Sequence, residues 1–214
     1  MQFNESISIL NRFQINNGSI PYIADIPLFE GNIRKINQKS VQEEIANAIL
    51  TFEKNNSFKQ NPSWKTHHLS DLYFNDNFIK DYSCKLLEEE IQNAVKAYLT
   101  AVGAGNNFPD FQISQSWVTK TYYKEYAHIH NHGFSDISGA YYFDTSGNDG
   151  NLFFPYPYNI TTTTIYLQHL LSDFDIKPEN GKLILFPGWL KHGVRTNTTD
   201  HARISLSFNL KLKI

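Results

Sequence analysis

The chain has 214 residues, of which 41% are hydrophobic and 19% charged, and its formal net charge is -2. This size and composition fit one globular domain with a filled core, and the charge excludes a broad cationic surface for nucleic acids or anionic membranes. Aromatic residues make up 14% of the chain, which favours a structure rich in β-strands.

Cys84 is the only cysteine, so no internal disulfide and no thiolate metal cluster can form. The first residues lack a basic stretch followed by an apolar run, and no segment reaches membrane-spanning length. We therefore expect a cytoplasmic protein without a membrane segment, and the sequence makes no prediction of oligomeric state.

The first part of the chain predicts edge strands and two helices. Broken apolar patterns predict short strands at residues 7–10 and 20–29. Ser40 and Glu43 have the spacing of a capping box, which predicts a helix over residues 41–54. A second apolar stripe predicts a helix from residue 76 or 77 to 102, with Cys84 as a buried, unreactive residue on it. His67 and His68 are adjacent, and we expect a surface or supporting role for both.

Alternating patterns then predict strands at residues 111–123, 137–143, 152–154, 161–167, 182–186 and 203–213. We interpret the chain as a mainly β protein with flanking helices (α+β), a β-sandwich or small barrel in a single domain over residues 1–214. Residues 1–110 would supply helical and edge-strand support, and residues 111–214 would form the core.

Three histidines cluster at His128, His130 and His132, and His192 follows about sixty residues later. Side chains two apart on a strand share a face, so a pair of imidazoles joined by a distant third can hold an ion and leave coordination positions open. We predict that His130, His132 and His192 bind one metal ion, with His128 outside the ligand set. The competing interpretation is a solvated histidine-rich edge.

The last predicted strand has an apolar row at Ile204, Leu206, Phe208, Leu210 and Leu212, and a polar row at Arg203, Ser205, Ser207, Asn209 and Lys211. The apolar row should pack on the helices, so that the polar row faces a cavity. Guanidinium binds carboxylates through a planar fork, and Ser205 could add a hydrogen bond. The alternative is an edge strand whose polar row faces solvent.

These motifs resemble the iron(II)- and 2-oxoglutarate-dependent oxygenase superfamily, in particular a branch with the patterns H-x-H-P-x-S-x-x-S-G, F-P-x-W-L-x-H and R-I-S-x-S-F-N. In this chain the patterns fall at residues 130–139, 186–192 and 203–209, and the match covers about residues 113–211. The resemblance implies a double-stranded β-helix, or jelly-roll, core. It also implies His130 and His192 as iron ligands, Arg203 as the anchor of the distal carboxylate of 2-oxoglutarate, and hydroxylation with succinate and CO2 as co-products.

The chain departs from the family pattern at two positions. Gly133 stands where the branch has proline, and His132 stands where the wider superfamily has aspartate or glutamate. A carboxylate would lower the net charge of iron, whereas a neutral imidazole does not. Either His132 completes an all-histidine triad, or Asp136 or another acid reaches the metal.

Four further residues are expected to line the cavity: Trp117, Tyr123, Tyr126 and Asn209. Simple packing within a sheet is the competing interpretation for each of them.

Two other functions fit the same residues. A cupin-like three-histidine dioxygenase would use the metal without 2-oxoglutarate, and a non-catalytic jelly-roll binding module would use neither. The substrate could be a protein side chain or a small metabolite, whereas the lack of a basic patch disfavours nucleic acid.

Overall fold

Two antiparallel sheets form the framework in the computed structural model, which describes residues 14–15, 18–19, 26–60, 66–73, 75–103, 110–155 and 173–213. The larger sheet has the strand order β3 (Phe29–Asn32), β11 (Lys182–Pro187), β8 (Ile137–Asp144), β13 (Arg203–Leu212), β6 (Phe111–Thr121), β5 (His68–Leu69) and β4 (Lys59–Gln60). The smaller has the order β10 (Phe174–Ile176), β9 (Leu152–Phe154), β12 (His192–Val194) and β7 (Ala127–His130). β1 (Gln14–Ile15) and β2 (Gly18–Ser19) pair separately.

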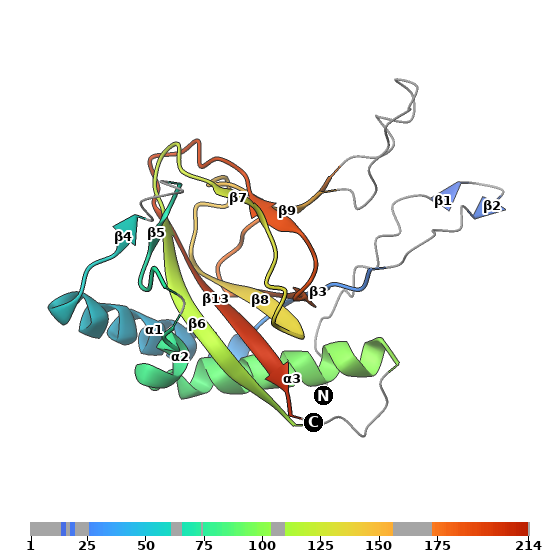
Figure 1. Cartoon of the computed structure of the whole chain (residues 1–214), viewed down its shortest axis with the longest axis horizontal. Helices are drawn as coiled ribbons and strands as arrows, with labels where there is room; N and C mark the ends of the chain where they lie inside the picture. The colour runs from blue at the N-terminus through green and yellow to red at the C-terminus, as the bar shows by residue number, and fades with distance from the viewer. Residues whose placement is uncertain are drawn as a thin grey trace.

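Helices α1 (Lys35–Asn55) and α3 (Lys85–Ala101) lie along one side of the larger sheet (Figure 1). Leu206, Phe208 and Leu210 of β13 join the buried cluster that these helices form with the sheet. The predicted packing of this apolar row on the helices is thereby confirmed for its three central residues, and the polar row of β13 is left to face the other way.

Helix α1 begins six residues before the predicted start, so Ser40 lies inside the helix and the predicted capping box is wrong. Glu90 of α3 anchors the actual start: its carboxylate accepts hydrogen bonds from the Arg34 backbone N–H (3.2 Å), Arg34 Nε (2.7 Å) and Asn37 Nδ2 (2.7 Å). A carboxylate from a distant helix thus satisfies the amide that a local cap would otherwise serve.

The single helix predicted up to residue 102 is two helices, α2 (Phe78–Asp81) and α3. Ser83 between them has φ 55°, the left-handed conformation, which interrupts the helix. Glu44 of α1 then accepts from the backbone N–H groups of Leu86 and Leu87, at 3.0 and 3.1 Å, and so caps α3. Cys84 precedes α3 and is fully buried, as predicted.

The strands predicted from residue 111 onward are found to within two residues of their predicted ends wherever the structure describes them. The strands expected at residues 7–10 and 161–167 lie outside the described residues. At residues 20–29 only the end is described, and β3 begins at Phe29.

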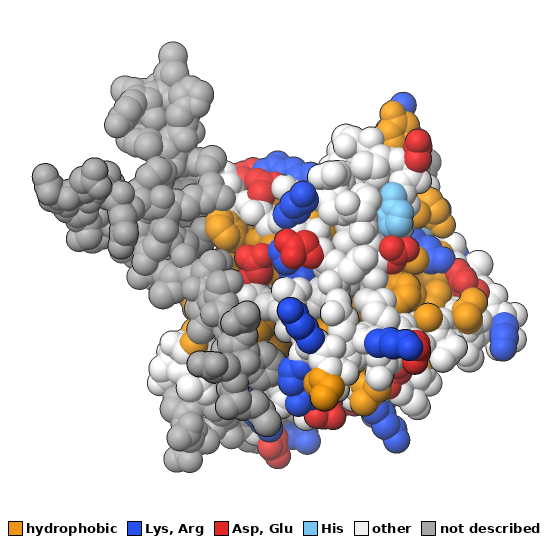
Figure 2. All heavy atoms as spheres, turned by 180° about the vertical axis from the view of Figure 1, so that it is seen from behind, with side chains coloured by type: hydrophobic (Ala, Val, Ile, Leu, Met, Phe, Trp, Pro, Cys, Tyr) orange, Lys and Arg blue, Asp and Glu red, His pale blue; other side chains and the backbone are white. Residues whose placement is uncertain are grey.

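Figure 2 shows acidic and basic side chains interspersed on the face opposite to that of Figure 1, so no extended patch of one charge forms on its described part. No helix in the described part of the chain is long and apolar enough to span a membrane.

Candidate metal centre

A cavity of about 650 Å³ opens between the two sheets. The larger sheet contributes the polar row of β13 and the facing row of β6, among them Arg203, Ser205, Trp117 and Thr121. The smaller sheet contributes His130 and His192. Among the residues that line the cavity, arginine supplies the only side chain with a formal charge at neutral pH and there is no carboxylate.

Strand pairing brings the first two histidines together. His192 opens β12 and is the register partner of His130, the last residue of β7. The next register pair is Val194 with Ala127, so β7 advances by three residues where β12 advances by two. This extra residue is a β-bulge in β7. Such a bulge rotates the following side chain, and Ala127 and His130 both reach the cavity.

His132 lies beyond the end of β7, so the predicted placement of His130 and His132 along one extended strand is wrong. The chain turns there, with the Ser135 N–H donating to the His132 carbonyl at 2.8 Å. The His132 N–H donates to the Gly188 carbonyl at 2.8 Å, which ties this turn to the loop before His192. A Cβ at Gly188 would lie 2.1 Å from the Ser135 carbonyl oxygen, so the two loops can approach only because residue 188 is glycine.

The structure brings His130, His132 and His192 together, with one ring nitrogen of each within 4.8 Å of the others. His130 Nδ1 lies 2.7 Å from the His128 carbonyl, and His192 Nδ1 lies 2.9 Å from the Leu190 carbonyl. A carbonyl only accepts, so each Nδ1 carries the proton and each Nε2 has a lone pair for a metal. The donor set therefore suits a divalent transition metal.

Burial keeps these imidazoles neutral. Desolvation lowers the pKa of His132 to about 4 and that of His192 well below its ordinary value, and the neighbouring His130 adds to both shifts. Desolvation also lowers the pKa of His130. A neutral imidazole is the form that binds a metal.

Asp136, the predicted alternative ligand, does not reach the cluster, and His128 lies outside it as predicted. Asp136 is exposed, and its carboxylate accepts from the Leu212 N–H at 2.8 Å, which fixes the end of β13. His128 is exposed and packs edge-on against the Tyr126 ring. In the described residues, the group of side chains suited to holding a metal consists of the three histidines.

Arg203 is buried in the cavity wall and its hydrogen bonds go to neutral groups. Nη1 donates to the carbonyls of Asp149 (3.1 Å) and Gly150 (2.5 Å), and Nη2 donates to Thr121 Oγ1 (3.0 Å). Nε is buried and has no hydrogen-bond partner among the described residues. Desolvation lowers the pKa of this arginine, with partial compensation from Tyr142 and Asp149. A buried guanidinium with an unused N–H is suited to an incoming carboxylate.

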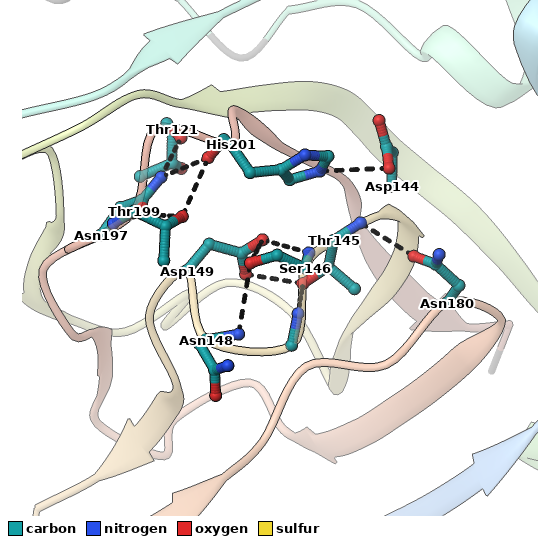
Figure 3. Close-up of polar contacts among 11 residues, drawn as sticks. Thr121, Asp144, Thr145, Ser146, Asn148, Asp149, Asn180, Asn197, Thr199 and His201 are labelled. Atoms are coloured by element: carbon teal, nitrogen blue, oxygen red, sulfur yellow. Dashed lines mark hydrogen bonds and ion pairs between the residues drawn. The ribbon is translucent and has the colours of Figure 1, made fainter.

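A hydrogen-bonded frame fixes the groups that Arg203 contacts (Figure 3). The buried Asp149 carboxylate accepts from Thr145 Oγ1 (2.6 Å) and from the Ser146 N–H (2.6 Å), which holds the loop that presents the Asp149 and Gly150 carbonyls. Asn197 donates to the Thr121 carbonyl at 3.0 Å. The guanidinium is therefore held in one orientation before any ligand arrives.

Two of the four predicted cavity residues, Trp117 and Asn209, line the cavity, and Tyr123 and Tyr126 do not. β6 ends at Thr121, so Tyr123 no longer follows its alternation and is 52% exposed. Tyr126 turns its ring toward His128.

Ser205 and Ser207 also line the cavity, whereas Lys211 is exposed. The polar row of β13 thus faces the cavity from Arg203 to Asn209.

His67, for which the sequence predicted a surface or supporting role, is buried and lines the cavity, a place that the sequence did not predict. Its Nδ1 lies 2.9 Å from Thr66 Oγ1 and 3.2 Å from the Tyr126 carbonyl, and desolvation lowers its pKa to about 4. The pairing of β5 with β6 brings it there, and no local pattern signals that long-range pairing.

A family model described as "Putative 2OG-Fe(II) oxygenase" matches residues 115–209, which include the three histidines and Arg203. A search of curated proteins finds no match.

Several solved structures share this fold at low sequence identity. HygX from Streptomyces hygroscopicus, with nickel, 2-oxoglutarate and hygromycin B bound, is 10% identical over 87% of this chain and 83% of its own, with a TM-score of 0.60. A Pseudomonas putida prolyl-4-hydroxylase is 12% identical over 88% and 94%, with a TM-score of 0.56. The non-heme alpha ketoglutarate dependent carbocyclase SnoK from nogalamycin biosynthesis is 9% identical over 85% and 79%, with a TM-score of 0.59. Their likeness confirms the jelly-roll core.

Proposed function

We propose that this chain is an iron(II)- and 2-oxoglutarate-dependent dioxygenase, like the family whose model matches residues 115–209, and that it hydroxylates an organic substrate and releases succinate and CO2. In this proposal His130, His132 and His192 hold one iron(II), and Arg203 with Ser205 binds 2-oxoglutarate. Bound iron(II) and 2-oxoglutarate would supply the oxidative chemistry, and the protein would bind, orient and exclude water.

One cavity holds both a three-imidazole cluster and an arginine that has no carboxylate ion-pair partner among the described residues, and this observation carries the proposal. Burying a cation without an anion is unfavourable, and the described ion pairs include none to Arg203. A dicarboxylate that chelates the metal at one end and reaches Nε of Arg203 at the other would supply that anion. Ser205, buried on the same face of β13, could donate to the same carboxylate.

The cavity also offers polar and aromatic groups for the substrate. Phe134 lines the cavity and is 95% exposed, and Gln115 and Thr119 of β6 also line it. HygX has a small molecule bound, and the prolyl-4-hydroxylase is named for a prolyl group. A small metabolite and a protein side chain both remain within the proposal.

A second function, a three-histidine metal dioxygenase without 2-oxoglutarate, is favoured by one observation. The third position of the triad is His132 and not a carboxylate. In that case Arg203 would only stabilise the loop at Asp149 and Gly150.

Succinate formation separates the two functions. Purified protein reconstituted anaerobically with iron(II) and then exposed to oxygen should convert 2-oxoglutarate to succinate slowly even without substrate, and His192→Ala should not. Stoichiometric iron without any succinate, together with unchanged 2-oxoglutarate, would favour the second function.

A further inference from the structure

Asn209 lies on β13 beside the third imidazole. It is 3% exposed, and its Nδ2 is 3.4 Å from Nδ1 of His132. Two other groups hold the amide: Ser138 Oγ donates to Oδ1 at 2.8 Å, and Nδ2 donates to Gln115 Oε1 at 3.1 Å. The amide is therefore fixed from both ends next to a candidate metal ligand.

His132 differs from the other two histidines in what contacts its Nδ1. Backbone carbonyls accept from Nδ1 of His130 and of His192, which leaves each Nε2 for a metal. Among the described residues, Nδ1 of His132 instead contacts the side-chain amide of Asn209. To bind through Nε2, His132 also needs an acceptor at Nδ1, because a neutral imidazole carries one proton.

Exchanging the nitrogen and oxygen of the Asn209 side-chain amide would give His132 Nδ1 an acceptor without moving any heavy atom. Nitrogen and oxygen of an amide are assigned from their partners, and Asn209 can equally place Oδ1 toward His132. Nδ2 would then donate to the Ser138 hydroxyl, which can accept, and Gln115 would reverse and donate to Asn209 Oδ1. In this arrangement Ser138 Oγ changes from donor to acceptor, Asn209 and Gln115 remain hydrogen-bonded to each other, and His132 Nδ1 gains an acceptor.

We infer that Asn209 is a positioning residue for the metal centre, which accepts the Nδ1–H of His132 and so aims its Nε2 at the metal. This inference rests on the proposed function, since it presumes a metal at the triad. It is specific to histidine at position 132. A carboxylate in that place would have no Nδ1 proton to satisfy and would not depend on Asn209 in this way.

A double-mutant cycle tests the dependence. The four proteins are wild type, Asn209→Leu, His132→Asp and the double variant, and the measurement is nickel(II) affinity by calorimetry. Loss of an outer-shell partner of a ligand weakens metal affinity by about 10- to 100-fold, so Asn209→Leu should do so in the wild-type background. In the His132→Asp background the same change should cost less than about threefold.

Two further variants control for packing. Asn209→Asp keeps an acceptor and should bind nickel(II) with nearly wild-type affinity, with the cobalt(II) absorption spectrum preserved. Ser207→Ala, on the same face of β13, should leave the affinity unchanged. If Asn209→Leu impairs folding, Asn209→Ala carries the same comparison without added bulk.

The outcomes separate the inference from the proposed function. Equal losses in both backgrounds, or no loss in the wild-type background, would overturn the role of Asn209. A wild-type protein that binds no nickel(II) at the three histidines would instead overturn the proposed metal centre.

Discussion

His130 and His192 are register partners across β7 and β12, and their ring centroids lie 4.4 Å apart. The antiparallel ladder thus positions two of the three candidate ligands. His132 joins them through a turn that the Gly188 loop holds in place. The site therefore depends on the pairing of two short strands more than on the spacing of the histidines in the sequence.

His192→Ala should abolish stoichiometric iron(II) binding, because it removes a buried imidazole, one of the three proposed ligands, that strand pairing places opposite His130. Metal content after anaerobic reconstitution and desalting measures the effect. His128→Ala is the matched control, since this exposed imidazole lies outside the triad, and it should retain one metal per chain. Full metal occupancy in His192→Ala would remove this histidine from the site.

Arg203→Lys should weaken 2-oxoglutarate binding by roughly ten- to a hundredfold while the metal still binds. Lysine keeps the charge but loses the planar fork, and hydrogen bonds to charged groups contribute on the order of 1.5–3 kcal/mol. Calorimetric titration of the nickel(II)-loaded protein with 2-oxoglutarate measures the change. An unaltered affinity for 2-oxoglutarate would show that Arg203 only stabilises the loop through its hydrogen bonds to the Asp149 and Gly150 carbonyls.

The strands in the second half of the chain were predictable because polar and apolar residues alternate along them, as they do in a strand with one buried face. The row from Arg203 to Asn209 on β13 follows from that alternation, and it correctly places an arginine in the cavity. Trp117 was predictable from the same period on β6.

The sequence did not predict the features that depend on contacts with residues far away in the chain. Helix α1 starts where Glu90 accepts from the Arg34 N–H, and α3 starts where Glu44 accepts from Leu86 and Leu87. His67 enters the cavity through strand pairing, and a bulge in β7 sets which residues face inward. None of these has a local sequence signature.

Cys84 should react slowly with thiol reagents in the native protein, because only the thiolate is nucleophilic and burial raises the pKa of this thiol to about 12. Labelling in denaturant should be at least about a hundredfold faster at pH 8. The raised pKa also means that folding stability falls as pH rises above about 9, where the unfolded thiol ionises. Rapid native labelling without unfolding would contradict the buried position.

The metal-free protein should lose stability as pH falls below about 6.5. Burial lowers the pKa of His67 to about 4, so the unfolded chain binds more protons between these two values. His67→Gln should reduce the slope of unfolding free energy against pH by up to about 1.4 kcal/mol per pH unit between pH 6 and 5. The two proteins should have equal slopes between pH 7.5 and 8.5, and equal slopes at the lower pH would contradict the neutral buried imidazole.

The most direct test of the central claim is an anaerobic absorption titration of the iron(II)-loaded wild-type protein with 2-oxoglutarate. Chelation of iron(II) by a 2-oxo acid gives a visible charge-transfer band, which should grow and saturate at one 2-oxoglutarate per iron. His192→Ala should give no band under the same conditions. Iron bound at one per chain with no band at saturating 2-oxoglutarate would contradict the claim and support a three-histidine centre that works without this co-substrate.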